Sequence, residues 1–392
     1  MRYVGLFCLV CFLKVGLAQQ IPPSGTSVLY NQEFLGEQHG DQLDFSQANV
    51  RFTKQGLQVA PATGLVKLNR YYALAQRVIR YHVQFSADTK AVFQSDKGDF
   101  KVLIDVPEKI IQIQTDPLLQ SKFINLQPTH EYIVEIRRNY QQSSIKLIDL
   151  YTAEETELQG TNDGTGGVGR GAEGIGFQLG RQYDYYCFGV QQGQGMLIKK
   201  IVVQAGQTQP VLLIYGDSIT EPEGYYPSKV FSQSWTQLII DQLRGKAISS
   251  GRGGTTIHEV LERIKNELPY LKAKYVMVTI GTNGGNTAQN LSELVEYIRS
   301  QGAIPILNNI PANESGSHLE VNAMLAEIRK KYAISGCLFD IATSEGQLGQ
   351  LVDRSTMYFE DYDWGEIYHH PNVKGSKLMF LRTFIDVPEI YE

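Results

Sequence analysis

The hydrophobic pattern of this chain changes its period near residue 205, and this change most constrains the fold. From about residue 25 to 204, short apolar runs alternate with polar residues at a period close to two. After residue 210 the apolar runs are continuous, and apolar residues at helical spacing lie between them. Alternating runs are typical of antiparallel strands, and continuous runs between helices are typical of buried parallel strands. The sequence therefore predicts two domains of different class.

The first domain, at 25–204, is predicted to be an all-β sandwich of the jelly-roll type. Its runs are rich in Val, Ile, Tyr and Phe, without convincing helices between them. Strands are predicted at 77–87, 100–106, 109–115, 131–138, 144–151 and 197–205. The glycine-rich stretch at 160–176 contains a formal GxGxxG, but it neither follows a strand nor opens a helix. It is therefore interpreted as a loop.

The second domain, at 211–392, follows a predicted linker at 205–210 and has the pattern of a doubly wound α/β fold with a parallel sheet. Strands are predicted at 211–215, 247–250, 275–281, 304–310 and 337–341. Helices are predicted around 235–243, 260–268, 291–298 and 324–328. Ligands of such sheets bind beyond the carboxyl ends of the strands, so loops at that edge are the place to look for a site.

Residues 1–18 resemble a secretory signal peptide. Arg2 precedes an apolar core, and a small-x-small pattern ends at Ala18. The segment is too short, and too interrupted by Lys14, to span a membrane. Cleavage after Ala18 and export to the periplasm or the outside are expected, without a lipid anchor; a buried N-terminal helix is the alternative interpretation. No other run is apolar enough for membrane insertion.

Charge and cysteine content exclude several classes of partner and site. The net charge of −5, without basic blocks, argues against nucleic acid and anionic membranes as partners. Only Cys187 and Cys337 remain after the predicted cleavage, and the sequence does not decide whether they pair. The stretches HEVLE and HEYIVE lack the second His of a zinc motif, so no metal and no cofactor is predicted.

Residues suited to nucleophilic catalysis follow successive strands of the second domain. Ser218 ends a Gly-Asp-Ser tripeptide after the first strand, Gly251 follows the second, and Asn283 follows the third. The pair 369–370, two histidines before a proline, lies near the C-terminus. A serine hydroxyl becomes a nucleophile when an imidazole takes its proton, and the resulting oxyanion needs N–H donors. These residue types thus suit ester hydrolysis.

This order of blocks resembles the SGNH hydrolase superfamily, also called GDSL esterases and lipases, over 211–392. The resemblance implies a three-layer α/β/α domain with Ser218 as nucleophile. It also implies an oxyanion hole formed by the backbone N–H groups of Ser218 and Gly251 and the side-chain amide of Asn283. One departure is Gly284, which stands where the family usually has Asp. The GxSxG elbow of α/β-hydrolases is absent.

The last block also departs from the family's Asp-x-x-His-Pro. If His370 is the base, the position three residues before it is Ile367; if His369 is the base, that position is Glu366, but the proline comes one residue late. His370 is favoured. A carboxylate or carbonyl at the imidazole Nδ1 is needed to hold the tautomer. Glu366, Asp363 and a backbone carbonyl remain the candidates for that role.

The whole chain looks like a bacterial two-domain SGNH protein of the carbohydrate-esterase kind. The expected activity is removal of acetyl or a similar small acyl group from a polysaccharide. Four aromatic residues expected near the reacting edge would suit a sugar ring, namely Tyr225, Tyr226, Trp364 and Tyr368. Two alternatives stay open, a lipid-ester hydrolase of the lysophospholipase kind and an inactive glycan-binding protein. The polysaccharide, the acyl group and the oligomeric state are not determined by the sequence.

Overall fold

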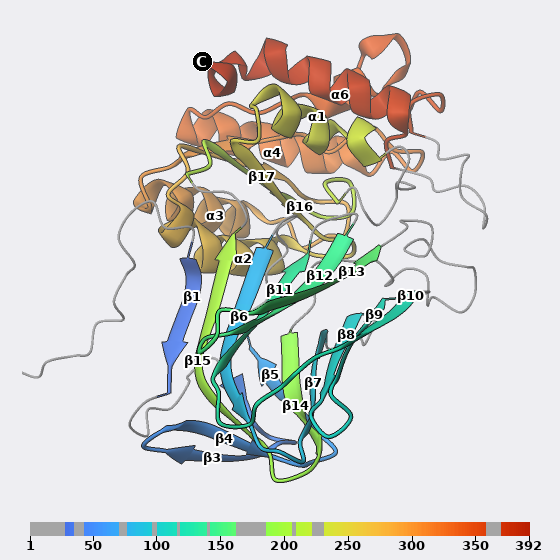
Figure 1. The fold of residues 1–392 in the computed structure, drawn as a ribbon. Coiled ribbons are helices and arrows are strands. Elements are labelled where there is room, and N and C mark those ends of the chain that lie inside the picture. Colours follow the sequence, from blue (N-terminus) through green and yellow to red (C-terminus); the bar gives the residue numbers. More distant parts are fainter. Residues whose placement is uncertain are drawn as a thin grey trace, which may run out of the picture.

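The computed structural model contains both predicted domains, an all-β sandwich and then a parallel sheet flanked by helices (Figure 1). It describes residues 28–34, 43–69, 77–95, 100–115, 118–138, 142–161, 186–205, 209–221, 231–357 and 370–392. The predicted signal peptide and most of the glycine-rich loop lie outside these residues. The interpretation that no strand precedes this loop is wrong, because a strand at Glu155–Thr161 runs into its first two residues.

Two antiparallel sheets form the described part of the sandwich. The first has the strand order β13-β12-β11-β6-β15-β4-β3, with β1 also paired to β15. Its strands are β1 (Val28–Glu33), β3 (Asn49–Thr53), β4 (Gly56–Ala60), β6 (Arg77–Phe85), β11 (Tyr132–Arg138), β12 (Gln142–Asp149), β13 (Glu155–Thr161) and β15 (Met196–Ala205).

The second sheet has the order β10-β9-β8-β7-β14-β5-β2. Its strands are β2 (Leu43–Asp44), β5 (Val66–Leu68), β7 (Lys90–Ser95), β8 (Phe100–Asp105), β9 (Ile110–Thr115), β10 (Leu118–Phe123) and β14 (Tyr186–Gln192). All six strands predicted from the alternating runs are confirmed, as β6, β8, β9, β11, β12 and β15.

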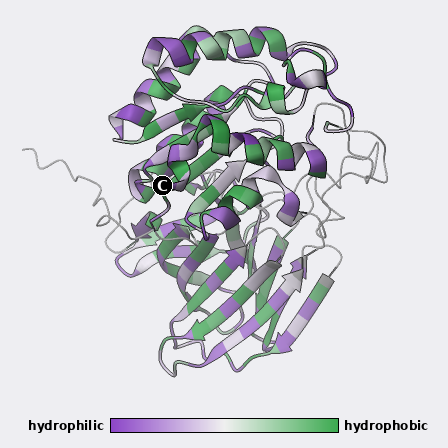
Figure 2. Cartoon of the chain, turned by 90° about the horizontal axis from the view of Figure 1, so that it is seen from above, coloured by the Kyte–Doolittle hydropathy of each residue, from purple (hydrophilic) through white to green (hydrophobic). Residues whose placement is uncertain are grey.

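Alternation along each strand explains why the sandwich forms. Every second residue of β6, from Arg77 to Phe85, is buried between the sheets. The residues between them face outward, where Arg80 Nε lies 2.6 Å from Glu135 Oε2. Figure 2 shows the same alternation of hydrophilic and hydrophobic residues along the strands of this domain. Because successive side chains point to opposite faces, this pattern also fixes the register.

The carboxyl-terminal domain has a parallel sheet of order β17-β16-β18-β19. The strands are β16 (Leu212–Gly216), β17 (Ala247–Gly251), β18 (Tyr275–Thr279) and β19 (Ile304–Leu307). The helices are α1 (Trp235–Gln242), α2 (Ile257–Leu271), α3 (Ala288–Ser300), α4 (His318–Tyr332), α5 (Phe339–Ala342) and α6 (Val373–Asp386), with 3-10 turns η2 (Phe231–Gln233), η3 (Glu345–Gln347) and η4 (Pro388–Tyr391).

These helices cover both faces of the parallel sheet. Helices α2, α3 and α4 pack on one face, and α1, α5 and α6 contribute to the core on the other. The four helices predicted from apolar spacing are confirmed as α1 to α4. Three of them begin at side chains that cap the helix: Ser234 accepts the Gln237 N–H at α1, Thr256 and Glu259 form a capping box at α2, and Thr287 accepts the Asn290 N–H at α3.

The strand predicted at 337–341 is wrong, because this segment enters helix α5. Side chains take the N–H groups that a strand would use for its ladder. The Cys337 N–H donates to Asn308 Oδ1 at 2.8 Å, and the Leu338 N–H donates to Asp386 Oδ2 at 2.7 Å. The carbonyls of Ser335 and Cys337 still accept the N–H groups of Leu307 and Asn309, both at 2.9 Å, so the segment lies beside the end of β19 but does not form a regular ladder. A short apolar run does not by itself distinguish a strand from a buried helix start.

One hydrophobic core runs through both domains. It contains Tyr81 of the sandwich, Leu213 and Tyr215 of β16, and Ile264 of α2. Helix α2 also contacts strand β1, and in Figure 1 α2 and α3 lie between the parallel sheet and the sandwich. The two domains are therefore one packed unit, and the sandwich braces the helices beneath the nucleophile strand.

Cys187 and Cys337, whose pairing the sequence left open, are both buried, and no disulfide joins them. Within the described ranges, no helix has the length and apolar character needed to cross a membrane.

We predict that Ile264→Ala shifts a single unfolding transition of the whole protein. Ile264 is fully buried in the shared core, and truncation of a buried Ile costs about 2–5 kcal/mol. Calorimetry should show one transition at a lower temperature, whereas Ile385→Ala, at a side chain 68% exposed, should have little effect. Separation into two transitions, with the sandwich unaffected, would contradict the shared core.

Candidate active site

Ser218 lies in a turn at the carboxyl end of the central strand β16 and is 6% exposed. The side chain of Asp217 shapes this turn, because its Oδ1 accepts the Ile219 N–H at 3.0 Å. The Asp217 carbonyl accepts the N–H groups of Thr220 and Glu221, both at 3.1 Å. Among the described residues, none accepts a hydrogen bond from the Ser218 N–H. That donor therefore stays available beside the hydroxyl.

His370 meets Ser218 from the other end of the domain. Its Nε2 lies 2.7 Å from Ser218 Oγ, and its side chain is buried. Two residues later Asn372 caps α6, with Oδ1 accepting the Gly375 N–H at 3.0 Å. The Asn372 N–H donates to the Thr356 carbonyl at 2.9 Å, which fixes the start of the helix. The His-Pro-Asn sequence thus places the imidazole just before a well-anchored helix.

Gly251 ends strand β17, where it pairs in register with Gly216. A Cβ at this position would lie 2.4 Å from the carbonyl carbon of Thr220, which belongs to the turn that holds Ser218. Only glycine permits this close approach. The end of β17 therefore packs directly against the backbone of the Ser218 turn.

Asn283 is exposed in the loop after β18, and its Nδ2 donates to the Thr255 carbonyl at 3.0 Å. A side-chain amide has two N–H groups, so this bond fixes the side chain and leaves a second donor. Ser218, Gly251, Asn283 and His370 all follow or flank the carboxyl ends of the parallel strands, as predicted.

The group that orients His370 remains a prediction. Glu366 and Asp363, the two carboxylates proposed for that role, lie outside the described residues, and so does His369. The four aromatic residues expected at this edge, Tyr225, Tyr226, Trp364 and Tyr368, lie outside them too.

A buried charge cluster beneath the site was missed by the sequence reasoning. Arg263 of α2 is 1% exposed, and its Nη2 donates to the carbonyls of Gly216 at 2.8 Å and Ser250 at 3.3 Å. One turn later, Glu267 Oε2 accepts the Tyr215 hydroxyl at 2.7 Å. The available signal was their spacing, because both charges fall within the apolar stripe of α2.

Glu221 is a second residue that the sequence reasoning passed over. It is 1% exposed, three residues after Ser218, and its Oε2 accepts the Gly253 N–H. This contact ties the Ser218 turn to the loop after β17.

Burial changes the acidity of two carboxyl groups in this region. It raises the pKa of Asp217 to about 7, against the opposing effect of the Ile219 N–H. It also raises the pKa of Glu267 to about 7, against the Tyr215 hydroxyl and the nearby Arg263. A buried carboxylate loses the stabilisation that water gives its charge, and these hydrogen bonds replace only part of that stabilisation. Both groups therefore titrate near neutrality.

A metal centre is not formed by the described residues, which contain no group of three or more His, Cys, Asp or Glu side chains placed to hold an ion.

The comparison with protein families decides what kind of domain carries this geometry. Residues 214–378 match the GDSL-like Lipase/Acylhydrolase family. The match covers a little over two fifths of the chain and confirms the resemblance found in the sequence. The carboxyl-terminal domain is thus similar to this family of lipases and acylhydrolases, and we refer to it as the GDSL-like domain.

The GDSL-like domain is also similar to curated proteins. Platelet-activating factor acetylhydrolase IB subunit alpha2 of Homo sapiens is 29% identical over 141 residues, as are the proteins of Rattus norvegicus and Bos taurus. Each match covers 33% of this chain and 58% of the relative, so the chain spans little more than half the length of these proteins.

Three solved structures show partial similarity to the chain. A GDSL-like lipase from Bacteroides thetaiotaomicron is 19% identical and covers 45% of this chain and 88% of its own, with a TM-score of 0.34. An acetyl xylan esterase from Geobacillus stearothermophilus is 17% identical and covers 44% of this chain and 92% of its own, with a TM-score of 0.36. The exoplasmic/lumenal domain of VIP36 is 10% identical and covers 44% of this chain and 87% of its own, with a TM-score of 0.33. At such scores the fold assignment rests on the strand order of the chain itself.

We predict that Glu267→Gln makes stability less dependent on pH. The raised pKa means that the native carboxyl binds its proton more tightly than the unfolded chain does. The unfolding free energy should therefore fall as pH rises from about 5 to 7, with a slope approaching about 1.4 kcal/mol per pH unit for one such group.

Urea unfolding at pH 5, 6, 7 and 8 measures this slope. The Gln variant should lose about half of it, because Asp217 has a similarly raised pKa and supplies the rest, while Glu262→Gln, at an exposed position of the same helix, should keep all of it. Equal slopes in the Glu267→Gln and wild-type proteins would show that Glu267 does not contribute to the pH dependence.

Proposed function

We propose that this protein is a secreted serine esterase that removes acetyl or similar small acyl groups from a polysaccharide. The observation that carries the proposal is the hydrogen-bonded pair of Ser218 Oγ and His370 Nε2, 2.7 Å apart at the carboxyl edge of the sheet. An imidazole at this distance is within reach of the hydroxyl proton, which is the first geometric requirement for a general base.

In the proposed reaction, Ser218 Oγ attacks the ester carbonyl while His370 Nε2 takes the hydroxyl proton. The tetrahedral intermediate collapses when His370 returns that proton to the sugar oxygen, and the sugar hydroxyl leaves. Water then attacks the acyl-serine with His370 again as base, which releases acetate and restores Ser218. A carboxylate or carbonyl at Nδ1 would hold the imidazole in the required tautomer, and Glu366 is our candidate.

The proposed oxyanion donors are the backbone N–H groups of Ser218 and Gly251 and the Asn283 amide. Three observations support this assignment. The Ser218 N–H meets no acceptor among the described residues, Gly251 packs against the Ser218 turn, and Asn283 is fixed by Thr255 with one N–H to spare. A preorganised donor of this kind lowers the barrier by about 3–4 kcal/mol.

The choice of acyl group and alcohol rests on separate observations. The curated relatives of the GDSL-like domain are named acetylhydrolases, which supports a small acyl group. The predicted signal peptide and the aromatic residues that the sequence predicts near the reacting edge, such as Tyr226 and Trp364, support an extracellular glycan as the alcohol. The same relatives are named for platelet-activating factor, so a lipid ester is the second candidate.

We predict that Ser218→Ala and His370→Ala each reduce hydrolysis of p-nitrophenyl acetate at least about a thousandfold, because nucleophile and base act as one unit. His369→Ala is the matched control and should remain active. If His369→Ala is the inactive variant instead, the base is His369 and Glu366 becomes its partner. If the wild type is inactive and covalent serine probes leave Ser218 unlabelled, the glycan-binding alternative replaces the esterase.

We predict that the purified protein releases acetate from acetylated xylan, pectin or mannan. Release can be followed enzymatically, with Ser218→Ala as the blank. Activity on long-chain p-nitrophenyl esters that exceeds activity on the acetate ester would instead favour the lipid-ester candidate. No acetate from any of the three polymers would overturn the proposed substrate class.

A further inference from the structure

The end of the sandwich remote from the GDSL-like domain holds a cavity of about 410 Å³. We propose that this cavity is a second binding site, specific for a neutral saccharide. The proposal relies on the function above only for its choice of glycan. The cavity lies where β6 ends and β15 begins, and its lining residues include Gln55, Gln58, Gln84 and Gln194.

The chemistry of the lining matches hydroxyl groups. None of the described residues that line the cavity is charged. No hydrogen bond between described residues uses the side-chain amides of Gln55, Gln58 and Gln194, so each offers one acceptor oxygen and two N–H donors. Sugar hydroxyls donate and accept in the same way, whereas a phosphate or carboxylate would find no cation here. The amides therefore favour an uncharged, hydroxyl-rich ligand.

Apolar groups complete the lining. Leu197 and Pro128 supply this apolar surface, whereas the side chains of Phe85 and Met196 are only 2% exposed and belong to the sandwich core. A pyranose has C–H groups on its faces and hydroxyls on its rim, so a cavity with apolar surface between amides suits its two kinds of surface.

The turn between β14 and β15 is locked in place. Gly195 has φ +124, and a Cβ there would lie 2.3 Å from the Val59 carbonyl oxygen. The Gly195 carbonyl accepts the Ser86 N–H at 3.0 Å and the Thr89 hydroxyl at 2.5 Å. This turn carries Gln194, so its amide projects from rigid backbone.

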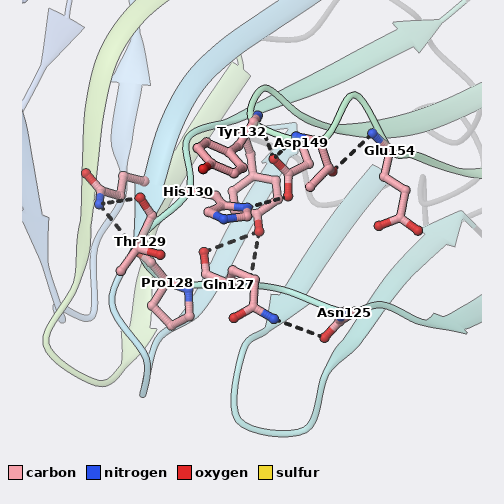
Figure 3. A network of polar contacts seen from close by, with 11 residues as sticks. Asn125, Gln127, Pro128, Thr129, His130, Tyr132, Asp149 and Glu154 are labelled. Atoms are coloured by element: carbon pink, nitrogen blue, oxygen red, sulfur yellow. Dashed lines mark hydrogen bonds and ion pairs between the residues drawn. The ribbon is translucent and has the colours of Figure 1, made fainter.

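The opposite wall, which carries Pro128, is fixed by a polar network (Figure 3). His130 Nδ1 lies 2.7 Å from Asp149 Oδ2, and the Gln127 N–H donates to the Tyr132 hydroxyl at 2.7 Å. Both walls are thus formed before any ligand arrives. A preformed site loses less conformational entropy on binding than a mobile one.

The position of the cavity makes it a separate site from the esterase edge. Strand β15 begins at the cavity and runs for 10 residues toward the GDSL-like domain. At the usual strand rise its length is about 30 Å. The sugar unit bound in the cavity and the sugar unit whose ester reaches Ser218 must therefore be different units. The cavity would hold one part of a polymer while Ser218 acts on another.

Binding measured in a Ser218→Ala background tests this site without hydrolysis. The ligands are xylohexaose and mannohexaose, titrated calorimetrically. We expect at least one of these two hexasaccharides to bind. When Gln58→Ala and Gln194→Ala are added together to the Ser218→Ala protein, the affinity should fall about tenfold because hydrogen bonds to the sugar are lost. Gln114→Ala, at an exposed glutamine of β9 away from the cavity, is the matched control and should bind like the parent. Melting temperatures confirm folding.

Three results would overturn the proposal. They are the absence of binding of both hexaoses, undiminished binding by the Gln58→Ala, Gln194→Ala protein, and preference for polygalacturonate over the neutral sugars. The second would place the saccharide at the esterase edge instead. None of these results bears on acetate release by the wild type, so failure of this site and failure of the esterase proposal remain distinguishable.

Discussion

A guanidinium group buried beneath the nucleophile strand holds the GDSL-like domain together at its centre. Arg263 reaches from α2 to the carbonyls at the ends of β16 and β17, and thereby fixes the helix against the sheet where Ser218 leaves it. Two carboxyl groups, Asp217 and Glu267, lie within its field. A buried charge is tolerated only when hydrogen bonds and opposite charges surround it, so these groups depend on one another. Because α2 also packs on β1, this arrangement extends to the sandwich.

Period and length determined how much of the fold could be read from the sequence. Long alternating runs such as β6 and long amphipathic helices such as α3 were recognisable, because many residues repeat the same signal. Strands of two or three residues, such as β2 and β5, carry too little pattern to be seen. The error at 337–341 has a different origin: Asn308 and Asp386, distant in sequence, supply the hydrogen bonds that direct the chain into a helix.

The candidate site was predictable to the extent that its residues lie in local motifs. Ser218 and His370 stand in short recognisable blocks, and the structure brings them within 2.7 Å although 152 residues separate them. Arg263, Glu267 and Glu221 belong to no such block. Their importance arises from burial and from contacts with backbone carbonyls or N–H groups, which a single sequence does not reveal. Charged residues inside an apolar helical stripe are the one sign that α2 gives in advance.

Under the two proposals above, the shared core of the two domains has a consequence for how the protein would move along a polysaccharide. A flexible linker lets a catalytic domain sweep a large volume around its anchor, and the local concentration of its targets falls as that volume grows. Here the common core holds the far end of β15 at a fixed offset from Ser218. A molecule anchored through that end would sample only the ester groups within one molecular length. Deacetylation would then spread along a chain in contiguous patches rather than at scattered positions.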